Sequence, residues 1–194
     1  YSPDRGLTGM DTIKVADGRF SYETTLGDEA TFIIVFPNYS ELPVFGKSGT
    51  TAEISGDASH LKEVEIHGEK NNEDMTAFRL SVANMTPPQA KKAAEEYISK
   101  NPKSIVSLYL IRKYLINTKE PDYEKAYTLT KAMVDADKNN AGASMLLSQL
   151  KELRHVKKGG RLPSFSATDI EGKAVSGAKL KGKLNVIISW AGWN

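Results

Sequence analysis

The sequence predicts an α+β protein in which an N-terminal antiparallel β-sandwich or barrel is followed by a four-helix region and then by further strands. Two changes of hydrophobic periodicity predict this order. Short runs rich in β-branched and aromatic residues fill residues 1–85, a helical pattern fills residues 86–158, and strand-like runs return in residues 159–194. We expect the domain boundaries at these two changes, because a chain of 194 residues can form one large domain or two small ones.

The composition is that of a folded globular protein and limits the chemistry available to it. Apolar residues make up 40% of the chain and charged residues 26%, and no apolar run reaches the roughly 20 residues of a membrane helix. The absence of cysteine from this sequence excludes disulfides, thiolate metal sites and a cysteine nucleophile. We therefore predict no cofactor and no metal site.

The charge is distributed unevenly between the two ends of the chain. Residues 1–85 carry 7 basic and 14 acidic side chains, whereas residues 86–194 carry 19 and 10. Such asymmetry can indicate nucleic-acid binding. Here the lysines fall at helical intervals among acidic residues, without the interleaved aromatic side chains of a base-stacking surface. We therefore expect no nucleic-acid partner.

Six short strands are predicted in the first region. The most specific signal is Asp17-Gly18, which separates two strand-like runs as the turn of a β-hairpin does. Their spacing is typical of a small antiparallel sandwich or barrel. The six predicted strands span residues 12–15, 19–23, 30–36, 42–45, 51–55 and 63–67.

Four helices are predicted in the second region. The motif Thr86-Pro87-Pro88-Gln89 is a capping box with proline at the first helical position. The second helix is apolar nearly all round, which predicts that it is buried. Short loops predict antiparallel helix hairpins. The predicted helices span about 87–100, 104–116, 121–134 and 141–153.

A tetratricopeptide-like array is an alternative interpretation of the helical region. The pattern of residues 123–127 favours it, and it would make the chain a helical peptide-binding protein. The pattern occurs once, however, and about three repeats are needed for a stable array.

Several side chains that could carry chemistry are better explained as structural. The histidines lie in different predicted elements, the acidic string alternates as the solvated face of a strand does, and the tyrosines have the spacing of interhelical packing. These residues are His60, His67 and His155, the string Glu63, Glu65, His67 and Glu69, and Tyr109, Tyr114, Tyr123 and Tyr127.

Four landmarks occur in order between residues 160 and 193. They are Gly160-Arg161-Leu162-Pro163-Ser164-Phe165, Asp169-Ile170-Glu171-Gly172-Lys173, Lys181-Gly182-Lys183 and Trp190-Ala191-Gly192-Trp193. This order resembles the start of a thioredoxin-like domain, in which Asp-x-x-Gly-Lys is carried by a β-hairpin. The family it resembles is that of the envelope thiol–disulfide oxidoreductases and peroxiredoxin-like proteins, Gram-negative lipoproteins with an N-terminal β-rich pre-domain. Asp169 and Glu171 would flank the turn of that hairpin, so we expect a turn role for them and not acid–base catalysis. The resemblance implies an incomplete thioredoxin-like domain in residues 159–194 and a location in the periplasm or outer-membrane-associated cell envelope. It also implies that membrane attachment, if any, is through a lipid anchor upstream of Tyr1.

The sequence departs from that family where its chemistry begins. The family places a nucleophilic cysteine directly after Trp-Ala-x-Trp, and here that position is Asn194. A carboxamide cannot become a thiolate or form a mixed disulfide. We therefore interpret Trp190, Ala191, Gly192, Trp193 and Asn194 as a degenerate active-site motif and predict no catalytic residue.

Residues 184–190 have the pattern of an interior strand of a covered sheet. Burying Val186, Ile187, Ile188, Trp190 and Trp193 is worth on the order of 10 kcal/mol, at about 1.5 to 3 kcal/mol for each side chain. We therefore expect residues 184–193 to find a protein partner, either the N-terminal sheet or a second copy of the chain.

Three functions are consistent with these observations. We favour a non-catalytic cell-envelope binding or assembly protein that is related to thiol–disulfide oxidoreductases and is redox-inactive. The first alternative is a fragment of such an oxidoreductase, with an active domain that continues past residue 194. The second is the helical peptide-binding protein described above.

Overall fold

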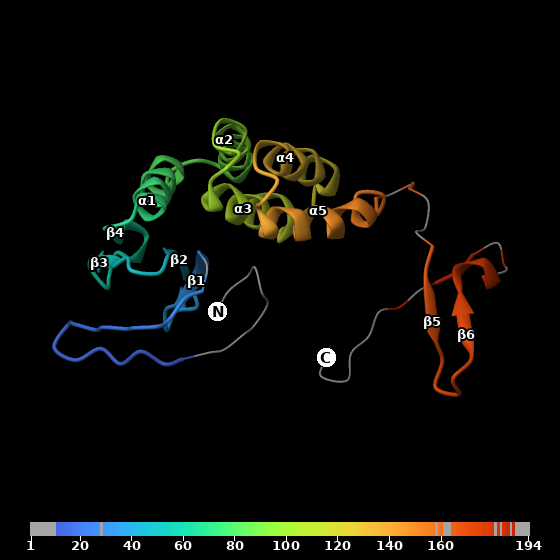
Figure 1. Ribbon diagram of the computed structural model, residues 1–194, viewed down its shortest axis with the longest axis horizontal. Coiled ribbons are helices and arrows are strands. Elements are labelled where there is room, and N and C mark those ends of the chain that lie inside the picture. The colour runs from blue at the N-terminus through green and yellow to red at the C-terminus, as the bar shows by residue number, and fades with distance from the viewer. Residues whose placement is uncertain are drawn as a thin grey trace.

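The structure, a computed structural model, describes residues 11–27, 29–157, 159–160, 164–180, 182, 184–186 and 188. It is a mixed arrangement of helices and antiparallel strand pairs, which confirms the predicted α+β class (Figure 1). The strands are β1 Ala30–Val35, β2 Glu41–Gly46, β3 Glu53–Ser55, β4 Glu65–His67, β5 Ser166–Thr168 and β6 Ala174–Ser176. The helices are α1 Lys70–Val82, α2 Pro87–Lys100, α3 Ile105–Ile111, α4 Tyr123–Ala136 and α5 Ala141–Leu153.

The N-terminal strands form two-stranded sheets, and no closed barrel forms among the described residues. β1 pairs with β2 from Ala30 opposite Gly46 to Val35 opposite Glu41. β3 pairs with β4 in the same antiparallel sense. The connection from β1 to β2 is a tight loop in which the N–H of Phe36 donates to the carbonyl of Ser40 at 2.9 Å. The four strands predicted between residues 30 and 67 are thus present, in two small sheets.

The two strands predicted at 12–15 and 19–23 are not formed as strands. Their turn is present, because Ala16 and Arg19 exchange two backbone hydrogen bonds of 3.0 and 2.9 Å. Asp17 and Gly18 between them have φ of 50° and 73°, as the central residues of a type I′ turn require. We call residues 12–23 the arm. It extends away from the sheets and helices (Figure 1), so the local turn signal was correct but the ladder that would extend it is missing.

Helix α1 was not among the predicted elements. The carboxylate of Glu69 caps it and accepts from the backbone N–H groups of Asn71 and Asn72 at 2.8 and 3.3 Å. Met75 and Phe78 are buried, one helical turn apart. The sequence shows this spacing. The residues before it are rich in strand patterns, however, and the whole of residues 1–85 was therefore assigned to the β-rich region.

The four helices predicted in residues 86–158 are all present. The side chain of Gln89 accepts from the N–H and the hydroxyl of Thr86 at 2.9 and 2.8 Å, which confirms the capping box. Six of the seven residues of α3 are buried, as its apolar circumference predicted. The chain continues from α3 into a π-helical turn, Arg112–Ile116.

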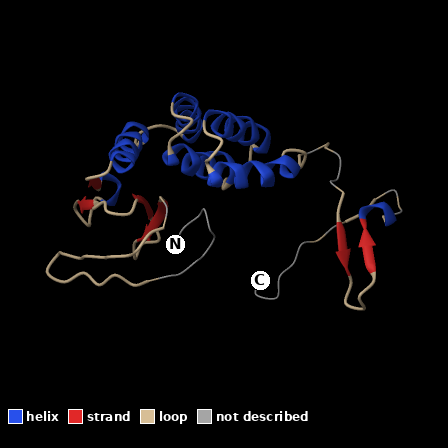
Figure 2. Ribbon diagram, in the orientation of Figure 1, coloured by secondary structure: helices blue, strands red, loops and turns tan. Residues whose placement is uncertain are grey.

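The helices form two pairs that repeat along the chain. α2 and α4 each have 14 residues and begin at Pro87 and Tyr123, and α3 and α5 begin at Ile105 and Ala141. The repeat length is therefore 36 residues for both members of a pair. Few positions 36 residues apart are identical, among them Ala90 with Ala126 and Leu110 with Leu146, so the sequence pattern alone does not show the repeat. A self-sufficient array needs about three repeats, and only two helix pairs are present among the described residues. The strands β1 to β4 and helix α1 pack at the N-terminal end of the two helix pairs (Figure 2).

One main core joins the sheets to the helices. Ile33 of β1 and Phe45 of β2 are buried in the same cluster as Met75 of α1 and the inner faces of α2 to α5. A second, smaller cluster lies between the two sheets and is centred on Leu42, Val64 and Ile66. The sheet β1–β2 is therefore covered on both faces. No helix among the described residues is long and apolar enough to cross a membrane.

Candidate functional site

The C-terminal part of the chain contains the hairpin that the landmark Asp169 to Lys173 predicted. β5 and β6 pair from Ser166 opposite Ser176 to Thr168 opposite Ala174. The Asp169 carboxylate closes the turn by accepting from the backbone N–H groups of Glu171 and Lys173 at 3.0 and 2.8 Å. Asp169 therefore has the turn role that its position suggested, and the turn positions Ile170 fully in solvent.

Beyond this hairpin, apolar side chains alternate along an extended segment and are exposed. Leu184, Val186 and Ile188 are 85%, 76% and 82% exposed. The described residues of this segment belong to no strand, so the expected pairing with the N-terminal sheet is not made by them within one chain. Single apolar side chains at a surface are ordinary, but three in alternation form one face of a strand. This row is the strongest candidate for a binding segment.

The degenerate motif lies outside the described residues. Trp190, Ala191, Gly192, Trp193 and Asn194 all fall there, so their interpretation stays a prediction from the sequence.

The histidines lie apart, as predicted. His67 Nε2 lies 3.0 Å from a carboxylate oxygen of Glu65, and His60 Nδ1 lies 3.5 Å from one of Asp57. His155 is exposed just after α5. Within the described part of the chain, no three His, Asp or Glu side chains come together as metal ligands would.

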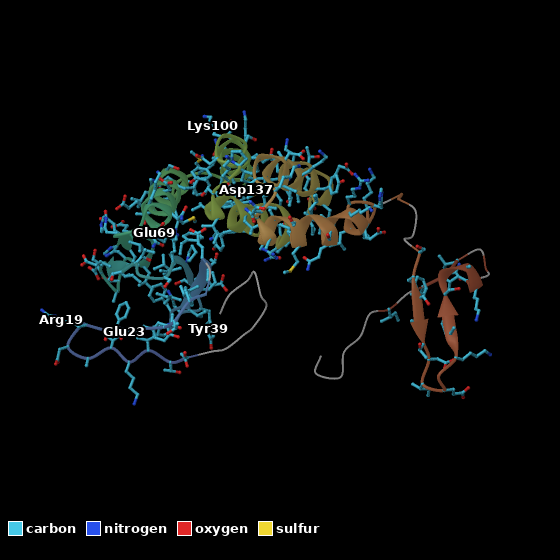
Figure 3. The ribbon with its side chains drawn as sticks, in the orientation of Figure 1. Arg19, Glu23, Tyr39, Glu69, Lys100 and Asp137 are labelled. Atoms are coloured by element: carbon cyan, nitrogen blue, oxygen red, sulfur yellow. The ribbon has the colours of Figure 1, made fainter. Side chains whose placement is uncertain are left out.

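The acidic string is only partly one strand face. Glu65 and His67 are exposed on β4 on either side of buried Ile66, which confirms the alternation there. Glu63 instead ends a 3-10 turn, Leu61–Glu63, and Glu69 is the N-cap of α1 (Figure 3). The strand therefore stops two residues short of the predicted face, because a helix begins.

The tyrosines take part in packing, as their spacing predicted. Tyr109 meets the ring of Phe45 edge-on at 6.2 Å, and Tyr114 meets the ring of Phe78 at 5.9 Å. Tyr127 lies under the guanidinium of Arg154 at 4.2 Å, and Tyr123 packs against the main core.

A shallow hollow of about 420 Å³ lies on the outer surface of α2 and α4. A peptide-binding groove would be expected to present exposed aromatic side chains, and this hollow is lined by charged ones. Lys125 Nζ lies 3.5 Å from Glu95 across it. The lining residues are Lys92, Glu95, Glu96, Ser99, Lys100 and Lys125.

The N-terminal part of the chain matches a known family. No curated protein and no solved structure matches the chain. The likeness of residues 160–193 to thioredoxin-like proteins therefore stays a prediction from their landmarks. The match that is found covers the two sheets and the first turns of α1, less than half of the chain: residues 1–75 match the family described as a domain of unknown function, DUF4369.

Proposed function

We propose that this protein is a non-catalytic binding or assembly protein of the cell envelope, related to thiol–disulfide oxidoreductases and redox-inactive, which associates through residues 184–193. The observation that carries the proposal is the row of Leu184, Val186 and Ile188, each more than three-quarters exposed. An uncovered apolar strand is a template for pairing with another chain.

The side chain that follows the thioredoxin-like landmarks of residues 160–193 supports a binding role and not a role in electron transfer. Where the family has its attacking sulfur, this sequence has the carboxamide of Asn194. An amide has no thiolate form to attack a disulfide. The envelope location rests on the resemblance of residues 160–193 alone.

A second copy of the chain is the partner we propose for this segment. Burying the row of both copies, six side chains in all, stabilises a dimer by about 9 to 18 kcal/mol, taking about 1.5 to 3 kcal/mol for each. Part of that free energy offsets the loss of freedom on association. A micromolar self-association, about 8 kcal/mol, lies within reach.

Sedimentation of the full chain tests this proposal. We expect self-association that is lost in Val186→Asp, because the variant places a charge in the buried row. Asn185→Asp is the matched control, since it adds the same charge on the opposite face of the segment and should leave association unchanged. A monomer at 100 µM, about a hundred times the micromolar dissociation constant expected above, would contradict the proposal.

The alternative is a fragment of a thioredoxin-like oxidoreductase whose active domain continues past residue 194. The well-formed β5–β6 hairpin favours it, because that hairpin has the turn expected at the entry of such a domain. The sequence and mass of the natural gene product distinguish the two proposals. Dithiothreitol-dependent insulin reduction by the natural product would support the oxidoreductase and exclude a redox-inactive protein.

A further inference from the structure

The β5–β6 hairpin has different charges at its two ends. Its turn end carries two carboxylates and one lysine, from Asp169, Glu171 and Lys173. At its open end, the antiparallel pairing brings the residues before β5 next to the residues after β6 (Figure 1). The N–H of Gly177 donates to the carbonyl of Phe165 at 3.3 Å. The two flanks of the hairpin therefore begin side by side.

Both flanks are basic and contain no acidic residue. We call residues 155–165 and 177–183 the basic flanks. Lysines of the helices have carboxylates close by, as Lys131 has that of Asp135 at 2.6 Å, whereas no carboxylate occurs within the flanks to balance their charge. The lysine and arginine residues of the flanks are Lys157, Lys158, Arg161, Lys179, Lys181 and Lys183. Of these, Lys157 and Lys179 are among the described residues, and both are exposed.

Apolar side chains are exposed in the same flanks. Val156, Phe165 and Leu180 are 50%, 37% and 39% exposed. The Phe165 ring lies over Gly177, where an added Cβ would come within 3.1 Å of it, so an aromatic ring lies where the flanks meet. Among the described residues, neither core includes a side chain from beyond α5. Cations next to exposed apolar side chains are typical of segments that lie on a membrane surface.

We propose that the basic flanks dock the open end of the hairpin on an anionic lipid surface. The cations lie among the negatively charged headgroups, and the apolar side chains enter the boundary between headgroups and acyl chains. The turn end, with its two carboxylates, points away from the membrane, because like charges repel. This inference goes beyond the proposed function, since it concerns residues outside 184–193 and a lipid partner.

The residue types of the flanks favour a lipid surface over a nucleic acid. A surface that binds single strands combines its cations with several aromatic side chains on which successive bases stack. The flanks contain a single Phe, Tyr or Trp side chain, that of Phe165. A cluster of four to eight lysine or arginine residues is instead characteristic of segments that bind acidic lipids.

Sedimentation of the full chain with lipid vesicles tests this proposal. At about 50 mM salt we expect binding to vesicles of equal parts phosphatidylglycerol and phosphatidylcholine, and no measurable binding to phosphatidylcholine alone. Binding should be lost at about 0.5 M salt, because salt screens exposed charges. The double variant Lys157→Gln with Lys179→Gln should bind about 25-fold more weakly. Each lysine accounts for about fivefold, which corresponds to about 1 kcal/mol where 1.4 kcal/mol is tenfold.

Lys92→Gln with Lys100→Gln is the matched control. It removes the same charge from two exposed lysines of α2 and should change vesicle binding less than twofold. Lys157 and Lys179 lie outside both cores, so an unchanged unfolding midpoint verifies that each variant is folded.

Four outcomes would overturn the proposal. The first is no binding to anionic vesicles at low salt, and the second is binding that persists at about 0.5 M salt. The third is an equal loss in the two double variants, because binding would then follow total charge and not the flanks. The fourth is tighter binding to single-stranded RNA than to the vesicles, because the surface would then be one for nucleic acid.

Discussion

Replacing Asn72 by alanine tests how β2 is held against helix α1. Asn72 is fully buried, and its amide is the partner of both backbone groups of Phe45. Alanine keeps the helix, because it is the best helix former. The change therefore isolates the two hydrogen bonds and the packing of the amide.

The expected loss is large for one side chain. A buried donor or acceptor left without a partner costs about 1 to 3 kcal/mol. Phe45 would be left with one of each, so the free energy of unfolding should fall by about 2 to 6 kcal/mol. This compares with a typical total of about 5 to 15 kcal/mol. Asn72→Asp should be worse at pH 7 than at pH 4, because the buried carboxyl loses the donor to Phe45 and becomes charged only as the pH rises.

Urea unfolding followed by far-UV circular dichroism measures this loss. Asn139→Ala is the control, since Asn139 is exposed between α4 and α5, and it should shift stability by less than about 0.5 kcal/mol. If Asn72→Ala were as mild as this control, water or another group would satisfy Phe45, and β2 would be held against α1 by other contacts.

Three further predictions concern the helices and a surface carboxylate. Phe78→Ala should cost about 3 to 5 kcal/mol in urea unfolding, because the ring packs edge-on against two tyrosines and links α1 to the helical layer; a loss below 1 kcal/mol would mean that α1 is not part of the main core. Gln89→Ala should cost about 1 kcal/mol, since the capping box of α2 is lost, and an unchanged midpoint would contradict that role. The pKa of Asp135 should be about 2 by NMR titration, because Lys131 and Lys138 bond its carboxylate; this stabilisation is present above the ordinary pKa and is lost as the pH falls from about 4 to 2. Lys131→Met should return the pKa of Asp135 toward its ordinary value. Salt at 0.5 M should also raise the pKa of Asp135, because it screens the exposed charges of the two lysines.

Local features were predictable because their causes lie within a few residues. The type I′ turn at Asp17-Gly18 needs only two residues that tolerate positive φ. The cap of α2 at Thr86 and Gln89 needs only a hydroxyl and an amide three residues apart. The burial of α3 followed from apolar residues all round its circumference. Each of these predictions is confirmed by the structure.

Two of the six predicted strands are not formed, because a strand is stabilised by a partner that can be far away in sequence. Residues 12–15 and 19–23 have the same β-branched and aromatic character as β1, yet only β1 finds both a paired strand and apolar layers on its two faces. Helix α1 was overlooked for a different reason: Met75 and Phe78 have helical spacing, but the strand-rich residues before them led to a β assignment for the whole of residues 1–85.

The sequence by itself determined the α+β class, the four consecutive helices with their caps, the Asp169 turn and the absence of cysteine from these residues. Those depend on periodicity, capping geometry and side-chain chemistry, which act over a few residues. Only the tertiary structure decided that the amide of Asn72 binds both backbone groups of Phe45 at one edge of the sheet. That outcome depends on which backbone groups face a residue 27 positions away, and no local pattern records it.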